Sequence, residues 1–465
     1  MTKISKTKST MVLAVIIGIF TILYCSLIFN QNIWTDEAFT IDLTRKNNLL
    51  DIIRQTAIDV HPPLYYVIVK CFISLFGSSF QVYKLVSILP MLLTMLLSVT
   101  HIKRWFGVTQ AGLFLVFLNA IPCVMEYSVQ IRMYSWCIFF ITLAGLSAYG
   151  VYTQGTFRQY CALTLSALCA CYTHNFAMIS AVMLYFLLGT ALIIHHKKFP
   201  LRWLLSGVVV GAGYLPWLPV LLRQTGSRVG NYWIAPVTME TILGYFSDLF
   251  GSRLPYTAVL FGILLILGLC CFKDTRREER FVVLLALVPV LTALAGILVS
   301  VLVTPFFIAR YLLPCMGLAA LFLAVGFGRA LQRRVSLVLL SAFLAVMAAN
   351  AYYTNVLSEY YSTHTGELLC YLEEAMEEND LILYNNQEYG FIYECYFSPN
   401  QLCFLDDMDF DAAYHQIWYF DSCVSPWLPD DVLQAHGLTK EYIATLGIEQ
   451  NDFILYRIFR KEGVL

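Results

Sequence analysis

Charged residues are scarce in this 465-residue sequence. Asp, Glu, Lys and Arg make up 13% of it, against about a quarter of an ordinary soluble domain. Hydrophobic residues reach 59%, and most of them lie in long uninterrupted runs. These runs exclude a soluble globular fold, and they are too long for the strands of a closed β-barrel. The sequence therefore predicts a polytopic membrane protein whose spans are all helical.

Several signatures of chemistry are also missing. The 14 cysteines contain no Cys-x-x-Cys pair and no Cys/His zinc spacing. The acidic C-terminal part has no glycine-rich phosphate loop and no nucleophile elbow. A basic face for nucleic acid is absent too, so nucleic acid is not an expected partner. Most cysteines lie in apolar runs and are expected to be small core residues; four lie near the C-terminus (Cys370, Cys395, Cys403 and Cys423), where spacing does not reveal a disulfide pattern.

The charges divide the chain into two parts. Residues 1–353 contain 26 Lys and Arg but only 11 Asp and Glu, whereas residues 354–465 contain 4 and 20. We therefore predict a membrane domain over 1–353 and an acidic, water-soluble domain over 354–465. The second part alternates short apolar runs with one helical stretch, which is typical of a small α/β unit. Its expected elements are a helix over 367–378 and strands over 380–384, 416–420 and 453–457.

Eleven apolar stretches are near the length of about 20 residues that crosses a bilayer. They are 9–30, 80–100, 109–125, 132–152, 158–173, 175–195, 203–222, 255–272, 281–303, 307–327 and 335–352. A twelfth stretch, Pro62 to Gly77, is shorter and carries Lys70 in its middle. The pattern over 42–57 suits an amphipathic helix lying on the membrane.

Lysine and arginine are enriched in cytoplasmic loops, and this bias decides the topology. If 62–77 does not cross, the cytoplasmic side receives Lys103, Arg104, Arg158, Lys197, Lys198, Arg202, Lys273, Arg276, Arg277, Arg280, Arg329, Arg333 and Arg334. The outer side then holds only Arg132, Arg223, Arg228, Arg253 and Arg310 between residue 84 and the acidic domain. We therefore predict 11 spans, an interfacial or re-entrant helix at 62–77, a cytoplasmic N-terminus and an extracytoplasmic C-terminal domain.

The stretch Trp34-Thr-Asp-Glu37 follows the first span directly. Two adjacent carboxylates are costly to place beside lipid, so Asp36 and Glu37 either form a site at the membrane surface or end a helix and face water. The first outer loop, residues 31–79, holds five of the 11 acids of the membrane domain. Because few other carboxylates lie on the predicted outer side, this loop is the favoured place for external chemistry.

Six short motifs carry a resemblance to a known family. They are Trp34-Thr-Asp-Glu37, His61-Pro-Pro-Leu-Tyr-Tyr66, Gln130-Ile-Arg-Met-Tyr134, Tyr172-Thr-His-Asn175, Tyr214-Leu-Pro-Trp-Leu-Pro219 and Arg310-Tyr-Leu-Leu-Pro314. Together they cover about 30–330, and they resemble membrane glycosyltransferases of the GT-C fold. The closer group is family 39-like, with the protein O-mannosyltransferases and the lipid A aminoarabinose transferase.

This resemblance implies a polyprenyl-phosphate sugar as donor and an acceptor reached from outside the cell. It also implies that the aspartate of the first outer loop is the catalytic base, which is Asp36 here. Members of the family often have an acidic residue before the Arg-x-Tyr pattern, where this chain has Gln130. Hexosyl and pentosyl transfer, the envelope acceptor and the use of a divalent metal all stay open.

The chemistry of transfer assigns roles to further residues. An acceptor hydroxyl needs a carboxylate to take its proton, which we assign to Asp36, with Glu37 orienting groups or joining Asp36 at a divalent ion. The departing phosphate needs fixed cations; Arg132 and Arg310 are the first candidates, and Arg223 or Arg228 is a substitute. Three further residues are assigned to the donor site, namely His61, His174 and Tyr134. Each histidine could instead bind a metal or cap a helix, and Tyr134 is expected one turn from Arg132 on one helical face.

Two other functions compete with an enzyme. A transporter or flippase of a lipid-linked or small polar substrate would carry charges in mid-span and show internal repeats. Here the charges cluster at the outer ends of spans, and no clear repeat relates the two halves. A membrane scaffold would not explain why Asp36-Glu37 and His61-Pro62-Pro63 flank one loop. We therefore expect a multi-pass glycosyltransferase of the cell membrane, with lipid as its surroundings.

Overall fold

A computed structural model places the chain in two compact units. The model describes residues 3–30, 32–228, 234–251, 255–272, 276, 278–357, 365–377, 379–412, 414–423, 426–448 and 451–460. The first unit contains Met1–Ile28 and Asn47–Leu357, and the second contains Phe29–Lys46 and Ser358–Leu465. Contacts thus group the segment that carries Asp36 and Glu37 with the C-terminal part of the chain.

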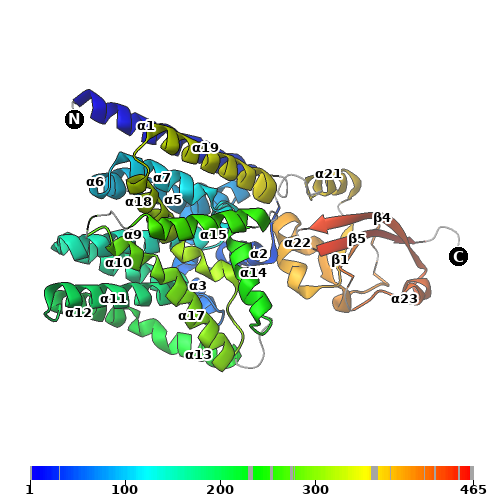
Figure 1. The fold of residues 1–465 in the computed structure, drawn as a ribbon. Coiled ribbons are helices and arrows are strands. Elements are labelled where there is room, and N and C mark those ends of the chain that lie inside the picture. Colours follow the sequence, from blue (N-terminus) through cyan, green and yellow to red (C-terminus); the bar gives the residue numbers. More distant parts are fainter. Residues whose placement is uncertain are drawn as a thin grey trace. The chain divides into compact units, whose positions relative to one another are not determined.

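The first unit is built from helices (Figure 1). Those of its first half are α1 Lys3–Ser26, α3 Leu49–Thr56, α4 Leu64–Phe76, α5 Phe80–Leu97, α6 Lys103–Trp105, α7 Val108–Ala120, α8 Pro122–Tyr127, α9 Tyr134–Thr153, α10 Phe157–Thr173 and α11 Asn175–His196. Those of its second half are α12 Leu201–Tyr214, α13 Leu218–Arg228, α14 Met239–Phe250, α15 Pro255–Cys270, α16 Phe281–Leu285, α17 Leu287–Leu302, the 3₁₀ helix η4 Ala309–Cys315, α18 Met316–Ala330 and α19 Arg334–Ala351.

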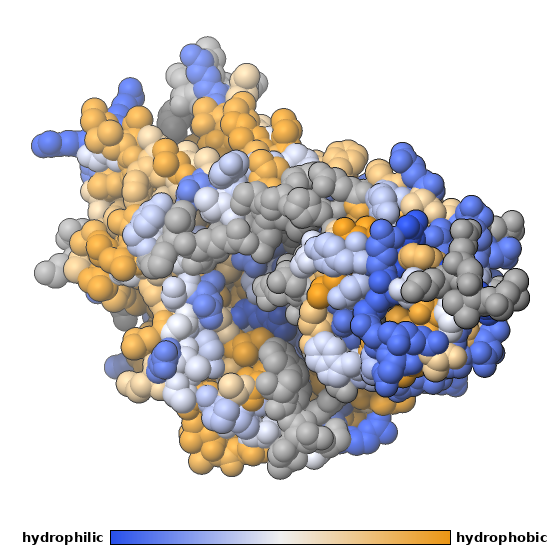
Figure 2. All heavy atoms as spheres, turned by 90° about the vertical axis from the view of Figure 1, so that its right-hand side faces the viewer, coloured by the Kyte–Doolittle hydropathy of each residue, from blue (hydrophilic) through white to orange (hydrophobic). Residues whose placement is uncertain are grey.

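The core of this unit lies around α9 and α18, whose residues are almost all buried. These helices are apolar on every side, which is the pattern of helices enclosed by other membrane helices. The peripheral helices instead expose large apolar side chains, such as Ile22 on α1, Phe186 on α11 and Leu298 on α17. Figure 2, which views the chain from the right-hand side of Figure 1, shows hydrophobic residues mainly around the edge of the view. The unit therefore has the surface of a body that faces lipid.

Close approach between α9 and α18 depends on glycine. A Cβ atom added at Gly317 would overlap the side chain of Thr142, and one added at Gly145 would overlap Leu318. Small residues of this kind let membrane helices pack at short range, where dispersion replaces the hydrophobic effect as the attraction between helices.

We expect Gly317→Ala to destabilise the membrane unit, since overpacking a filled core costs about 1–3 kcal/mol. The measurement is the thermal midpoint of the purified protein in detergent, which should fall by several degrees. Gly211→Ala on α12 is the matched control, because no atom lies within 4 Å of the added Cβ there. Equal midpoints for both variants would show that the α9–α18 contact is not tight.

All the predicted spans coincide with helices, but only some of these helices are long enough to cross a membrane. Eight helical segments are long and apolar enough to cross a membrane, among the residues that the structure describes. The stretch predicted as 109–125 is interrupted at Ile121, where Pro122 starts a new short helix, so α7 has only 13 residues. The helices α10 and α15 have 17 and 16 residues. The fold is thus a many-helix membrane protein; α10 reproduces the span predicted at 158–173, whereas α7 and α15 are shorter than the spans predicted at 109–125 and 255–272.

Two expectations for the first loop have different outcomes. The stretch after Pro62 forms α4, a helix of 13 residues, which is short for a crossing helix. The single amphipathic helix predicted over 42–57 is wrong. The chain instead forms α2 Thr35–Lys46 and α3, separated at Asn47–Asn48, because the Asn48 side chain accepts the backbone N–H groups of Leu50 and Asp51 and starts a new helix.

The second unit contains a five-stranded sheet in the order β2-β1-β3-β5-β4. Its elements are α2, α21 Thr365–Ala375, β1 Leu381–Tyr384, α22 Gly390–Tyr396, β2 Leu402–Phe404, β3 Ile417–Asp421, α23 Asp430–Ala435, β4 Leu438–Ile448 and β5 Asn451–Arg460. The strand β1 pairs in parallel with β2 and β3, while β5 is antiparallel to β3 and β4. The small α/β unit is therefore confirmed, with β2 and β4 as additions to the predicted strands. All 14 cysteines of the chain are free thiols.

Helix α2 packs against α22 within this second unit. The rings of Phe39 and Phe391 meet edge to face with centroids 6.2 Å apart. Lys46 forms ion pairs with Asp42 on its own helix and with Glu394 on α22. The segment between the first span and α3 is thereby held by apolar and charged contacts to the C-terminal residues.

Candidate active site

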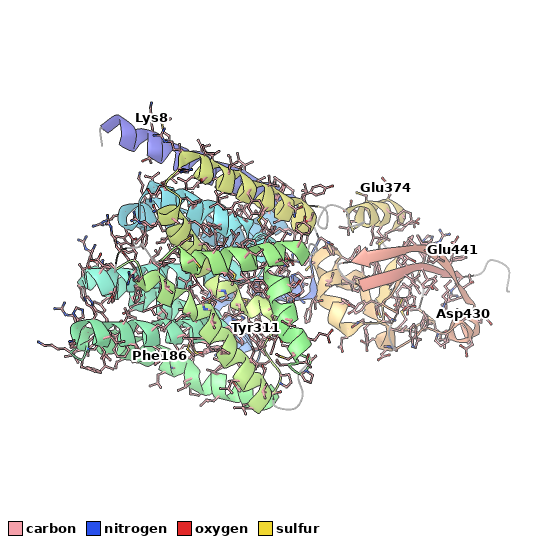
Figure 3. All side chains as sticks on the ribbon, viewed as in Figure 1. Lys8, Phe186, Tyr311, Glu374, Asp430 and Glu441 are labelled. Atoms are coloured by element: carbon pink, nitrogen blue, oxygen red, sulfur yellow. The ribbon has the colours of Figure 1, made fainter. Side chains whose placement is uncertain are left out.

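Three helices of the membrane unit begin beside one another around His174. The imidazole of His174 lies just before α11, and its ring centroid is 5.9 Å from that of Tyr134, the first residue of α9. It is 5.1 Å from the ring of Tyr311 in η4, which leads into α18. Figure 3 labels Tyr311 among the membrane helices. The starts of α9, α11 and η4 therefore meet at one buried point.

His174 has a defined hydrogen-bonding role. Its Nδ1 accepts the backbone N–H of Phe176 at 3.1 Å, so the ring acts as the N-cap of α11. Capping was one of the alternatives that the sequence left open for this histidine. An accepting Nδ1 carries no proton, so the proton of the neutral ring is on Nε2. That Nε2 is buried and has no hydrogen-bond partner among the described residues, which leaves one donor available to a ligand.

His61 lies against His174, with ring centroids 5.2 Å apart. The side chain is 9% exposed, and its buried Nδ1 has no hydrogen-bond partner in the described part of the chain. Burial lowers its pKa well below the usual value, and the charges of Arg132 and Arg310 lower it further. Burial, followed by the same two arginines, lowers the pKa of His174 to about 3. Both rings are therefore neutral at physiological pH.

Arg132 is 2% exposed and precedes α9. It lies in an irregular segment between α8 and α9, where its N–H donates to the carbonyl of Gln130 at 2.7 Å. The prediction that Arg132 and Tyr134 lie one turn apart on the same helical face is therefore wrong, because α9 begins only at Tyr134. The first turn of α9 contains no carboxylate, so a buried cation and the positive end of a helix dipole lie together.

The same arrangement recurs at the other two helix starts. Arg310 is half-buried in η4, and the first turns of η4 and α11 contain no acidic residue. Helix starts attract anions through their unpaired N–H groups. Two arginines and three positive helix ends therefore favour an anion at this point.

Two residues of this region were missed in the sequence. Tyr311 contacts His174 and stacks on Phe176 at 4.8 Å; its place beside Arg310 in the sequence was the available signal. Lys84 on α5 is completely buried. Its neighbours Val86 and Ser87 accept hydrogen bonds from Trp136 and Ser135 at the start of α9. A lysine inside an apolar run is costly in a membrane, which makes Lys84 a candidate functional residue.

A cavity of about 500 Å³ opens beside the two histidines. Its lining is mostly apolar, with side chains such as Ile179, Val299 and Phe306, and its polar lining residues include His61 and His174. Its size lies within the usual range for ligand cavities, about 300–1,000 Å³. The cavity suits an amphiphile whose polar end reaches the histidines.

Asp36 and Glu37 lie in the second unit, in the first turn of α2. Glu37 is 1% exposed, and its carboxylate accepts the backbone N–H of Trp34 at 3.2 Å, which closes the start of the helix. Asp36 is half-buried, and its carbonyl accepts the hydroxyl of Thr40. The interpretation that both carboxylates merely face water is therefore wrong for Glu37.

Arg223 lies on the exposed side of α13, where its guanidinium donates to the carbonyl of Ala57 at 2.8 Å. Its neighbour Gln224 donates to the carbonyl of Thr56, so both residues close the C-terminal end of α3. The side chain of Arg228 lies outside the described residues. No group of three or more His, Cys, Asp or Glu that could hold a metal ion occurs in the described part of the chain. The capped Nδ1 of His174 also leaves a protonated Nε2, which is not a metal ligand.

Comparison with known proteins decides the fold. Residues 60–219, about a third of the chain, match the family model described as dolichyl-phosphate-mannose-protein mannosyltransferase. A crystal structure of ArnT from Cupriavidus metallidurans bound to undecaprenyl phosphate superposes with a TM-score of 0.62, at 12% identity, over 96% of this chain and 98% of that one. The chain has the fold of ArnT. The apo structure of the same enzyme gives a TM-score of 0.61, at 12% identity, over 97% and 98% of the two chains.

The ArnT-like fold confirms the predicted GT-C architecture and the resemblance to membrane glycosyltransferases. The match to the family model contains His61, Arg132 and His174, three of the residues that meet in the membrane unit. No curated protein sequence matched the chain. Together these findings support a multi-pass membrane glycosyltransferase.

Proposed function

We propose that this chain transfers a sugar from a polyprenyl-phosphate donor to an acceptor at the outer face of the cell membrane. The observation that carries the proposal is the meeting of three helix starts and two arginines around the neutral His174, beside an apolar cavity. Such a site suits a ligand with an anionic head and an apolar chain. The fold agrees with this, since the ArnT structure that it resembles is bound to undecaprenyl phosphate.

The phosphate of the donor is assigned to Arg132 and Arg310. A guanidinium can hold two phosphate oxygens at once, and it stabilises the charge that develops on the phosphate as the sugar leaves. Lys84 is proposed as a third cation because its ammonium is fully buried near the start of α9. The first isoprene units of the donor are assigned to the cavity beside His61 and His174.

Asp36 is proposed as the general base. An acceptor hydroxyl attacks the anomeric carbon, a new C–O bond forms, and the bond from that carbon to the phosphate oxygen breaks. The hydroxyl proton passes to the Asp36 carboxylate, and polyprenyl phosphate leaves with the electron pair. Glu37 is proposed as a positioning residue, because its buried carboxylate holds the first turn of α2 that carries Asp36.

A lipid-linked donor also suits an outward-facing site, because nucleotide sugars are absent outside the cell. The test uses purified protein, a mixture of polyprenyl-phosphate sugars, and mass spectrometry of released polyprenyl phosphate. Sugar-dependent release with a glycosylated product supports a transferase. A folded protein that releases no polyprenyl phosphate from any donor, yet moves labelled substrate across sealed vesicles, would establish the transporter alternative instead.

The two ring nitrogens of His174 separate its structural role from its ligand role. An asparagine amide can replace Nδ1, and a glutamine amide can reach the position of Nε2. We expect His174→Asn to keep the cap of α11 and the thermal midpoint, while the KM for the donor rises about tenfold or more, because a hydrogen bond to a charged ligand is lost. His174→Gln should keep the KM closer to wild type and lower the midpoint.

The opposite pattern would show that His174 only caps α11. In that case His174→Asn would have the wild-type KM, and only His174→Gln would be impaired, through its lowered stability. Measuring KM and kcat separately at matched amounts of folded protein decides between the two patterns.

A further inference from the structure

A second cavity, of about 560 Å³, lies at the far ends of α10, α11 and α12 from His174. Its walls include the basic residues His196, Lys198 and Arg202 and the phenol-bearing residues Tyr152 and Tyr160. The three helices pack side by side in the membrane unit (Figure 1). This basic cavity is separate from the candidate active site, and the proposed transfer reaction does not use it.

The length of α11 places the two sites on opposite faces of the membrane. The helix has 22 residues, begins directly after His174 and ends at His196. At 1.5 Å per residue it is about 33 Å long, close to the thickness of the hydrocarbon core. A helix that crosses the bilayer therefore has the candidate active site at one surface and the basic cavity at the other.

Among the residues that the structure describes, no acidic side chain lines the basic cavity. The sequence contains no Asp or Glu between Glu126 and Glu240, and Glu278 and Glu279 of a later loop act electrostatically on Tyr149, three residues before the cavity residue Tyr152, without lining the cavity. Lys198 and Arg202 form no ion pair among the residues that the structure describes. The cavity therefore combines two cations that have no ion pair among the described residues with hydroxyl groups that can donate to an anion.

The surroundings of the cavity are apolar and face outward. Two membrane spans meet there, since one ends at His196 and the next begins at Leu201. Ile194 at the end of the first span and Leu201 and Leu205 at the start of the second are exposed. Only four residues join the spans, with Lys197 in the left-handed conformation, so Lys198 lies in a short connection at the ends of two candidate spans.

We propose that the basic cavity binds the phosphate head group of an anionic phospholipid. Lys198 and Arg202 would contact the phosphate, Tyr152 and Tyr160 would donate to it, and the acyl chains would lie along the exposed apolar side chains of α11 and α12. Basic pockets between membrane helices recognise anionic lipid head groups in this way. A soluble anion offers the same charge but gains nothing from the apolar flanks.

The test compares two double variants that remove the same charge. Lys198→Gln with Arg202→Gln acts on the cavity, whereas Arg333→Gln with Arg334→Gln removes two exposed cations near the start of α19. Each purified protein is mixed with phosphatidylglycerol or phosphatidylcholine, and bound lipid is counted by native mass spectrometry. Inorganic phosphate and polyprenyl phosphate are the two further ligands.

We expect wild type and the Arg333/Arg334 variant to retain phosphatidylglycerol in preference to phosphatidylcholine. The Lys198/Arg202 variant should bind phosphatidylglycerol about tenfold more weakly or worse, with an unchanged thermal midpoint in detergent alone. Equal binding by the two variants would overturn the proposal, since any pair of surface cations would then suffice. The assignment to a phospholipid would be overturned if inorganic phosphate bound as strongly as phosphatidylglycerol. It would also be overturned if polyprenyl phosphate were the one ligand that bound.

Discussion

The kcat of Asp36→Asn should be about 10²- to 10⁴-fold below wild type, which is the usual contribution of a general base. The amide is close to the carboxylate in size but cannot take the proton of the acceptor hydroxyl. The KM for the donor should change little, because the phosphate is assigned to arginines rather than to Asp36. The measurement is release of polyprenyl phosphate at saturating donor, with each protein normalised to its folded fraction.

Asp51→Asn is the matched control for Asp36→Asn, since Asp51 is an exposed carboxylate in the first turn of α3. It should retain wild-type kcat. Equal rates for wild type and Asp36→Asn would remove Asp36 from the proton transfer and direct attention to Glu37 or Glu126. Because Glu37 accepts the Trp34 N–H, Glu37→Ala, which removes this acceptor, should weaken the start of α2 and lower stability as well as rate.

Arg132→Gln should lower kcat/KM about 10²- to 10³-fold, the usual cost of removing one preorganised donor that stabilises developing charge. Arg132 is almost fully buried and lies beside two neutral histidines. In the Arg132→Gln variant, water therefore cannot readily stabilise the phosphate in place of the lost guanidinium. Arg132→Lys should recover part of the loss, because an ammonium supplies the charge but not the two-pronged geometry of a guanidinium. The measurement is kcat and KM with one purified donor.

Arg54→Gln provides the comparison for Arg132→Gln. Arg54 is exposed on α3 and, among the residues that the structure describes, forms its ion pair with nearby Asp51; exposed ion pairs of this kind contribute little to stability. Its loss should leave both kinetic constants near wild type. If Arg132→Gln behaved like Arg54→Gln, the phosphate would have to be held without Arg132, and Arg310 and Lys84 would become the residues to change next.

The sequence by itself determined that the chain is a helical membrane protein with an acidic α/β unit at its C-terminal end. Hydropathy and charge depend on the local sequence, so they can be determined without knowing how the helices pack. The motifs around His61, Arg132, His174 and Arg310 were found for the same reason, since each is a short segment at the end of an apolar run. Helix ends were less predictable: the side chain of Asn48 divided one expected helix into two.

Only the tertiary structure decided which of these residues share a site. His61, Arg132, His174 and Arg310 are separated by tens of residues, and their meeting depends on how α9, α11 and η4 pack. In the sequence, Arg223 was a candidate for the phosphate like Arg132. In the structure, its guanidinium donates to the carbonyl of Ala57 at the C-terminal end of α3. Lys84 gained its importance from complete burial, and the proton on Nε2 of His174 follows from one hydrogen bond to Phe176. Burial and single hydrogen bonds arise from contacts between distant segments, and residue order alone does not contain them.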